Sequence, residues 1–412
     1  MTDLREGDGE AVADRGWDAA TVDLLGRMHR AQPDELVPET NSAIARLGLR
    51  FVLYLIDHEQ ERLWALPDAG KDASPPILVD GTVAGRAFTA VRTQAGSRDG
   101  ERPYRLWVPM VDGSERLGVV EVVTDRPPAD PAAFRLRCET LVGLLGHLVT
   151  VKMPYGDGLR IARRTRPMSP AGELILEMLP PLTYSCHRLA ISAVLEPCYD
   201  VGGDAYDYAV DGPMARVSVL DAMGRGLAAG LTSAAALAAM RAARRDLQGL
   251  YAMARAADAA LIEQFPDLRF VTAVLAELDM ETGLLRYTNA GHPAPMLIRR
   301  GRVVKTLDGG RRMPLGLDDS AIDVGQEVLE PGDRLLIHTD GVTEAHNRDG
   351  ERFGVRRLAD LTERCMADRL PAPETLRRLA HTVLAHQGGR PSDDATLLLL
   401  EWSPEAAERT RP

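Results

Sequence analysis

The fold is decided by residues 201–226, which read VGGDAYDYAVDGPMARVSVLDAMGRG. Two apolar-rich stretches, Tyr206–Val210 and Ala215–Leu220, flank the turn residues Gly212 and Pro213. Strand-like runs on either side of such a turn predict a β-hairpin. An aspartate stands at the outer end of each strand.

Counting outward from the turn places Asp204 opposite Asp221. Opposed residues of an antiparallel pair have Cα atoms about 4.5–5.5 Å apart. Two carboxylates at that distance repel each other unless one takes a proton or a cation lies between them. The register therefore predicts a divalent-cation site at the open end of the hairpin, and a one-residue slip of the register would remove it.

The hairpin belongs to a longer region, residues 184–403, in which short strands joined by tight turns alternate with amphipathic helices. Hairpins dominate, so we expect antiparallel sheets in a two-sheet sandwich flanked by helices. The further predicted strands are His187–Leu195, Phe270–Leu278, Leu284–Asn289, Pro295–Arg299, Arg334–His338 and Ala395–Trp402, and the predicted helices are Gly226–Arg245, Tyr251–Phe265, Val355–Ala367 and Glu374–His386.

More carboxylates stand where predicted strands begin or end. Asp340 follows one strand within Thr-Asp-Gly, and Asp393 and Asp394 directly precede the last strand. A set of carboxylate oxygens favours Mg²⁺ or Mn²⁺ over Zn²⁺. Each motif alone is a common turn sequence, as at Asp279; the ordered set is what indicates a site.

The first 183 residues divide differently. Residues 1–17 are acidic without an apolar core and are predicted to be a disordered tail. Residues 18–153 combine helical patterns with two hairpins, which predicts an α+β module. Residues 154–183, rich in proline and arginine, are predicted to be a linker with a short helix, and residues 404–412 to be a tail.

Composition excludes several classes of protein. The net charge of −11 argues against sequence-independent binding of nucleic acid. The four cysteines have no C-x-x-C spacing, so neither a zinc ribbon nor a disulfide framework is indicated. The apolar stretches are shorter than the roughly 20 residues that a membrane span needs, and the acidic N-terminus is unlike a signal peptide. We therefore expect a cytoplasmic protein.

Taken in order, the motifs of region 184–403 closely resemble the bacterial PPM-type serine/threonine phosphatases, the type-2C relatives of the SpoIIE and Rsb class. The resemblance implies a β-sandwich between helical layers with a two-metal centre. The motifs that carry it are Val201-Gly202-Gly203-Asp204-Ala205-Tyr206-Asp207, Asp221-Ala222-Met223-Gly224-Arg225-Gly226, Thr288-Asn289-Ala290-Gly291-His292-Pro293, Pro314-Leu315-Gly316-Leu317, Thr339-Asp340-Gly341 and Asp393-Asp394-Ala395-Thr396.

By position in those motifs, the resemblance assigns Asp204 and Asp221 to both metals, two Mn²⁺ or Mg²⁺ ions. The carbonyl of Ala222 would serve one metal, and Asp340 and Asp393 would complete the ligands. Asp394 is the second choice for the place of Asp393, and the role of Asp207 is open.

The implied reaction is attack of a metal-activated water on a phosphoserine or phosphothreonine. Arg225 stands where eukaryotic relatives have a histidine acid, and guanidinium cannot serve as that acid, although it can bind phosphate. His292 is a candidate proton donor, with stabilisation of a turn as the alternative.

Residues 18–153 resemble a GAF domain in their order of elements. This resemblance implies a regulatory module that binds a small molecule or forms a homodimer. The resemblance of residues 184–403 to the PPM-type phosphatases implies a phosphorylated anti-sigma-factor antagonist as the substrate. Two alternatives stay open. One is a pseudophosphatase that binds partners without turnover, and the other is a small-molecule sensor in which the N-terminal module dominates.

Overall fold

The computed structural model describes residues 3–68, 75–96, 103–196, 199–200, 202–320, 323–368, 370–389, 391 and 393–404. The chain forms two compact units, the first ending at Thr165 and the second beginning at Arg166. This boundary falls inside the predicted linker.

The first unit is a six-stranded antiparallel sheet with helices on both faces, as the α+β prediction required. The strand order is β3-β2-β1-β6-β5-β4, and both predicted hairpins, β1–β2 and β5–β6, are present. The strands are β1 (Arg50–Ile56), β2 (Arg62–Ala65), β3 (Ile77–Leu78), β4 (Gln94–Ala95), β5 (Tyr104–Asp112) and β6 (Glu115–Thr124), and the helices are α1 (Asp3–Met28), α2 (Leu36–Ile44), α3 (Val83–Ala90), α4 (Pro131–Lys152) and α5 (Gly158–Ile161).

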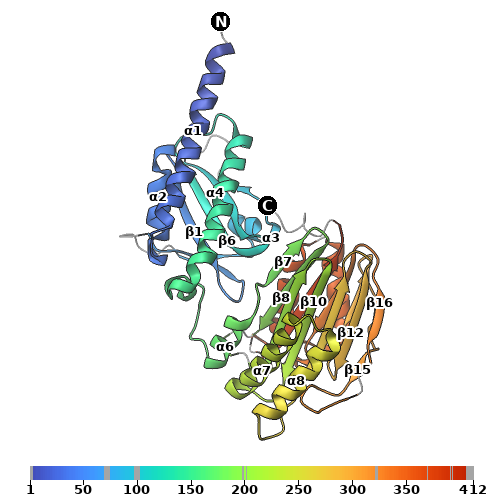
Figure 1. Ribbon diagram of the computed structural model, residues 1–412. Helices are drawn as coiled ribbons and strands as arrows, with labels where there is room; N and C mark the ends of the chain where they lie inside the picture. The colour runs from blue at the N-terminus through green and yellow to red at the C-terminus, as the bar shows by residue number, and fades with distance from the viewer. Residues whose placement is uncertain are drawn as a thin grey trace. The chain divides into compact units, whose positions relative to one another are not determined.

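Two apolar clusters hold this sheet between its helices. Side chains of α1, α2 and α4 pack on one face, where Leu24, Ile44 and Leu145 are fully buried. Helix α3 covers the other face through Ala87 and Phe88. Burial on both faces explains why β1 is an almost unbroken apolar run rather than an alternating one (Figure 1).

Two boundaries of the predicted organisation need correction. Residues 3–17, predicted to be disordered, belong to helix α1. The predicted linker is also more ordered than expected, because it contains α5, a 3₁₀ turn at 153–155 and helix α6 (Pro170–Met178), which is the short helix foreseen there. Of the predicted C-terminal tail, residues 405–412 lie outside the described part.

The second unit is a sandwich of two six-stranded sheets. One sheet has the order β15-β12-β11-β10-β9 with β16 paired to β12, and the other has the order β14-β13-β17-β18-β8-β7. Its strands are β7 (Thr183–Cys186), β8 (Leu189–Glu196), β9 (Asp204–Asp211), β10 (Met214–Ala222), β11 (Val271–Asp279), β12 (Leu284–Ala290), β13 (Met296–Arg299), β14 (Arg302–Thr306), β15 (Arg311–Arg312), β16 (Gly325–Val328), β17 (Asp333–His338) and β18 (Ala395–Trp402).

Helices cover both outer faces, which gives the predicted four layers. Helices α7 (Gly226–Arg245) and α8 (Leu250–Gln264) lie over the sheet that contains β10 and β12 (Figure 1). Helices α10 (Gly354–Ala367) and α11 (Ala372–His386) cover the other sheet, next to the short α9 (Asp340–Thr343). Between the sheets lies a separate core of aliphatic side chains from β8, β10, β17 and β18.

Helix α7 is the one described helix that is long and apolar enough to cross a membrane by length and composition. Only 44% of its most apolar window is buried. The buried part, including Ala229, Leu237 and Met240, packs into the core against the sheet, so this helix also has the properties of a core helix.

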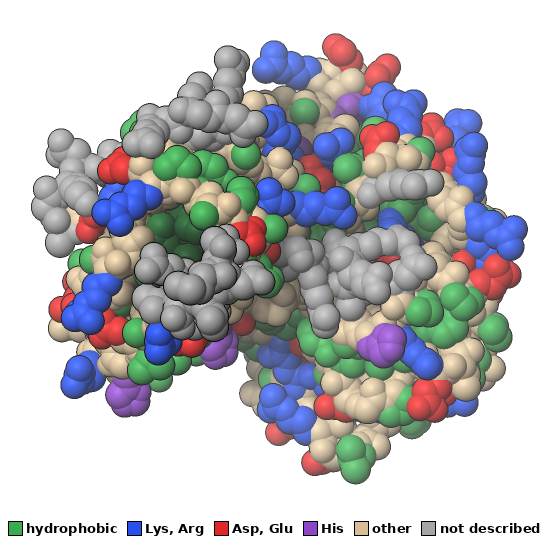
Figure 2. Space-filling model, turned by 90° about the horizontal axis from the view of Figure 1, so that it is seen from above, with side chains coloured by type: hydrophobic (Ala, Val, Ile, Leu, Met, Phe, Trp, Pro, Cys, Tyr) green, Lys and Arg blue, Asp and Glu red, His purple; other side chains and the backbone are tan. Residues whose placement is uncertain are grey.

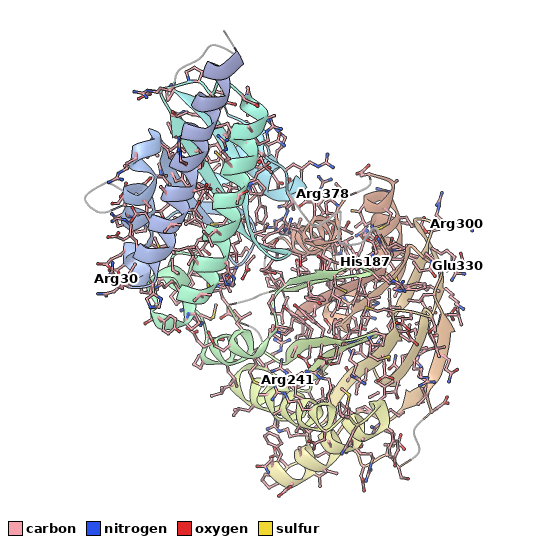
Figure 3. The ribbon with its side chains drawn as sticks, turned by 45° about the horizontal axis from the view of Figure 1, so that its top comes forward. Arg30, His187, Arg241, Arg300, Glu330 and Arg378 are labelled. Atoms are coloured by element: carbon pink, nitrogen blue, oxygen red, sulfur yellow. The ribbon has the colours of Figure 1, made fainter. Side chains whose placement is uncertain are left out.

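The surface carries charged side chains of both signs. On the face shown in Figure 2, basic and acidic side chains are interspersed without an extended field of either sign. Many of these charges are paired across short distances, as in the contact of 3.8 Å between Arg300 and Glu330, which lie near each other in Figure 3.

Candidate active site

The β9–β10 hairpin has the predicted register. Asp204 pairs with Asp221, and Met214 pairs with Asp211 beside the turn. Asp204 is buried and Asp221 is half-buried. The hairpin prediction is therefore confirmed, and two carboxylates stand side by side at the open end of these strands.

Two threonines hold the Asp204 carboxylate. Thr339 Oγ1 donates to Asp204 Oδ2 over 2.8 Å, and Thr396 Oγ1 donates to the same oxygen over 2.7 Å. The backbone N–H of Thr396 donates in turn to Thr339 Oγ1. Because the threonines come from the ends of β17 and β18, the bonds join both sheets at Asp204. Burial, and then the charges of Asp221 and Asp394, raise the pKa of Asp204 well above its usual value.

Asp221 lies at the centre of a group of like charges. Burial, and then the charges of Asp340, Asp393 and Asp394, together raise its pKa to about 7. Asp340 opens α9, and its pKa is also raised, by burial and then by Asp393 and Glu344. These shifts have two physical causes. The carboxylates gathered at one end of the sandwich lose contact with water, and their negative charges repel one another.

Asp393 and Asp394 have different surroundings. Asp394 is buried, and its Oδ2 accepts the backbone N–H groups of Gly202, Gly203 and Asp204 over 2.6, 2.8 and 3.3 Å. Asp394 therefore fixes the loop that carries Asp204. Asp393 is exposed and accepts a bond from the backbone N–H of Asp394.

Glycines allow these segments to approach closely. A Cβ atom on Gly341 would lie 1.8 Å from the carbonyl oxygen of Asp394, and one on Gly203 would lie 2.5 Å from the carbonyl oxygen of Ala222. Neither gap can hold a side chain. Packing at the site thus requires glycine at positions 203 and 341.

Arg225 lies at the N-terminus of α7, directly after the β10 segment that carries Asp221. Its side chain is exposed and forms no ion pair with any residue that the structure describes. The position that a Cβ of Gly202 would take lies 3.5 Å from the Cα of Arg225. Among the described residues Arg225 thus has no ion-pair partner, and its backbone lies close to Gly202, in the loop before Asp204.

His292 is buried in a turn, away from solvent. Thr272 Oγ1 lies 2.9 Å from its Nδ1, and its backbone N–H donates to Asn289 Oδ1 over 2.8 Å. Burial and the neighbouring His338 lower the pKa of His292 to about 3. The side chain is neutral at pH 7 and packed, which favours the structural alternative over proton donation.

Asp207 serves as an anchor for α7. It accepts bonds from Arg241 over 2.7 Å and from Arg244 over 2.6 Å, and Arg241 also donates to the carbonyl of Met178 at the end of α6. Figure 3 shows Arg241 on α7. The buried Asp207 carboxylate is thus compensated by two arginines and ties β9, which carries Asp204, to this helix.

Three polar residues of the site were not singled out in the sequence. They are Thr339 and Thr396, which hold Asp204, and Ser233 on α7, which donates to the carbonyl of Gly203. The threonines were visible inside the motifs Thr-Asp-Gly and Asp-Asp-Ala-Thr. Ser233 has no local signal, because its bond depends on how α7 packs.

The donor set fits a hard divalent cation in its chemistry. All the acidic groups offer oxygen, and their mutual repulsion is what a bound cation relieves. Within the described residues, no group of three or more His, Cys, Asp or Glu side chains converges closely enough to hold a metal ion. The assignment of Asp204, Asp221, Ala222, Asp340 and Asp393 as ligands stays a prediction.

Comparison with known proteins finds relatives for the second unit. Residues 211–403 match the family model of stage II sporulation protein E (SpoIIE), a match that begins after Asp204. The chain is 26% identical over 221 residues to phosphoserine phosphatase RsbU of Bacillus subtilis, covering 52% of this chain and 63% of that protein. It is 29% identical over 131 residues to protein IcfG of Synechocystis, covering 31% of this chain and 20% of that protein. The chain thus spans less than two thirds of these relatives.

Solved structures to which the chain is similar include the RsbU and RsbW domains of a Mycobacterium tuberculosis protein. That structure has a TM-score of 0.46 and 26% identity, covering 52% of this chain and 62% of that chain. The SiaA-PP2C domain of Pseudomonas aeruginosa has a TM-score of 0.45 and 26% identity, covering 52% of this chain and 86% of that chain. Residues 211–403 of this chain thus have the sequence pattern of the SpoIIE family, and this part of the chain is similar to a phosphoserine phosphatase.

Proposed function

We propose that the second unit hydrolyses phosphoserine and phosphothreonine on a regulatory protein with the help of divalent cations. The observation that carries the proposal is the group of carboxylates around Asp221, whose opposed partner is Asp204. Arg225 follows them in the chain, at the N-terminus of α7. Such a group is costly to the fold, and bound cations offset that cost. The sequence similarity to a phosphoserine phosphatase supports the choice of reaction.

Each residue of the group has a separate part. Asp204 and Asp221 would hold both cations, and the carbonyl of Ala222, Asp340 and Asp393 would complete the sites. When bound, two divalent cations supply a deprotonated water at neutral pH and neutralise phosphoryl oxygens. Thr339 and Thr396 fix the Asp204 carboxylate through one oxygen.

Arg225 would bind the phosphoryl group of the substrate. Its guanidinium stays charged throughout the working range of pH and matches phosphate oxygens in geometry. Since His292 is buried and neutral, neither side chain supplies the leaving-group proton, and we propose that solvent does.

The first unit would act as the regulator. Its sheet with helices on both faces is compatible with a GAF-like sensor that binds a small molecule or mediates a homodimer. We further propose an anti-sigma-factor antagonist as the phosphorylated partner and the cytoplasm as the compartment, both on the basis of the family resemblance. A pseudophosphatase is the alternative; all the predicted metal-binding carboxylates are present, and this favours turnover.

Removal of metal tests the proposal. We expect the full chain to hydrolyse p-nitrophenyl phosphate with Mn²⁺ present and to lose at least about 100-fold of that rate in EDTA, because the cations supply the nucleophile and the phosphoryl-binding charge. Excess Mn²⁺ should restore the rate. A rate that is equal in EDTA and in Mn²⁺ would rule out metal-dependent hydrolysis, and no rate under either condition would favour the pseudophosphatase.

A further inference from the structure

The start of α7 carries exposed aliphatic side chains beside the site. Leu227 and Leu231 are 48% and 46% exposed, and Met223, just before the helix, is 37% exposed. Leu227 and Leu231 are four residues apart and so lie on the same face of the helix, one turn from each other. Single exposed leucines are common on proteins. Three exposed apolar side chains in one segment of nine residues, 223–231, form a patch that needs an explanation.

The inward side of the same helix shows why these residues face outward. Ala229, Ser233 and Leu237 are buried, and Ser233 donates to the carbonyl of Gly203 in the loop before Asp204. Packing of this face fixes the rotation of α7, so Leu227 and Leu231 are held on the solvent side. Their exposure is set by the fold.

Arg225 places a positive charge on this surface. Arg225 stands between Met223 and Leu227, and no acidic residue lies in the first turn of α7. The N-terminus of a helix adds partial positive charge in the same place. Arg269, near Gly224, is paired with Asp267 over 3.0 Å. A phosphate on an occupant of this surface would therefore meet Arg225, next to apolar side chains.

We propose that Met223, Leu227 and Leu231 form a docking surface for the protein substrate. The partner that fits it is a phosphoserine segment in which aliphatic side chains flank the phosphorylated residue, so that the phosphate reaches Arg225 and the aliphatic groups cover the two leucines. This inference rests on the proposed function and specifies which phosphoserine segments the site prefers.

The test compares two phosphoserine peptides of equal length and net charge. One has leucine three residues before and four residues after the phosphoserine, and the other has serine at both places. With Mn²⁺, the wild-type chain is expected to show kcat/KM about tenfold higher for the leucine peptide, which corresponds to burial of aliphatic area. In the double variant Leu227→Ser, Leu231→Ser this ratio is expected to fall to about one. A ratio does not depend on the fraction of active protein, so partial misfolding cannot imitate the result.

Leu247→Ser provides the matched control. Leu247 is 91% exposed and follows the far end of α7, about 30 Å along the helix from Leu227. This variant is expected to keep the wild-type ratio. A wild-type ratio near one, or a double variant that keeps the wild-type ratio, would overturn the docking surface.

Two further outcomes are decisive in other ways. If light scattering finds a wild-type dimer that the double variant converts to a monomer, the surface joins two copies of the chain and the substrate proposal is wrong. Hydrolysis of p-nitrophenyl phosphate by the wild type tests the proposed function separately from the docking surface. Hydrolysis without peptide discrimination removes only the docking surface, whereas no hydrolysis of any substrate removes the proposed function and the docking surface with it.

Discussion

Replacement of Asp204 by asparagine is expected to lower kcat for p-nitrophenyl phosphate in Mn²⁺ by at least about 100-fold. The amide has nearly the same shape as the carboxylate and still offers an oxygen to Thr339 and Thr396, which hold this side chain over 2.8 and 2.7 Å. It lacks the charge that a pair of cations needs between them. Steady-state rates at saturating substrate measure the effect.

The same variant should unfold at a higher temperature than the wild type when EDTA is present. Burial and the charges of Asp221 and Asp394 raise the pKa of Asp204, so the ionised group destabilises the metal-free fold and a neutral amide relieves that cost. Each kcal/mol relieved raises Tm by about 2–4 °C in a domain of this size. Loss of activity in a stabilised protein separates a functional carboxylate from one needed for folding.

Asp279→Asn is the matched control for this experiment. Asp279 is at the turn after β11 and pairs with Met214, at the opposite end of the sheet from Asp221. The two ends are about 23 Å apart, because seven residues separate Met214 from Asp221 along the strand. The control is expected to keep the wild-type rate. Wild-type turnover by Asp204→Asn would contradict its place at the centre of the site.

Gly341→Ala is expected to lower both the stability of the fold and kcat/KM, the second-largest effect that we predict. The added Cβ would lie 1.8 Å from the carbonyl oxygen of Asp394, a backbone atom of the strand entry that also carries Asp393. The backbone must therefore move, which should destabilise the fold by about 1–3 kcal/mol or more. A displacement of about 1 Å at Asp340 and Asp393 is expected to cost about 100-fold in kcat/KM. Urea unfolding and steady-state kinetics measure the two effects.

Gly249→Ala controls for the loss of a glycine. Gly249 precedes α8 with a φ of −84°, and a Cβ there would meet nothing within 4 Å. Because Gly249 is the N-cap of α8, its replacement by alanine should cost no more than about 1 kcal/mol of stability, and kcat/KM should be unchanged. If Gly341→Ala behaves as Gly249→Ala does, the close approach between α9 and β18 is not needed for the site.

The sequence predicted the central hairpin and its two aspartates because the information is local. Gly212 and Pro213 define the turn, and the alternating strands on either side leave one register that buries the apolar face, the one that pairs Asp204 with Asp221. Helix α7 was likewise predicted with its observed bounds, since its apolar period is long and its ends are marked. Where a single hairpin or helix determines a feature, the pattern is enough.

Other features depend on approaches between distant segments. The clamp of Asp394 on Gly202 and Gly203 joins residues about 190 positions apart, and no local pattern distinguishes Asp394 from Asp393. Strand β15 has two residues and β16 has four, and both pair with β12. Strands this short are too brief to show a period in the sequence. Residues 3–17 were predicted to be disordered because they lack an apolar stripe, although helix α1 runs through them.

The central claim is that the carboxylates around Asp221 bind divalent cations, and equilibrium binding of Mn²⁺ tests it most directly. Titration calorimetry on the full wild-type chain, without substrate, measures binding apart from turnover. The account predicts about two Mn²⁺ ions per chain, with binding strongly reduced in Asp204→Asn and unchanged in Asp279→Asn. A folded wild-type chain that binds no Mn²⁺, or binds it equally well after Asp204→Asn, would contradict the account.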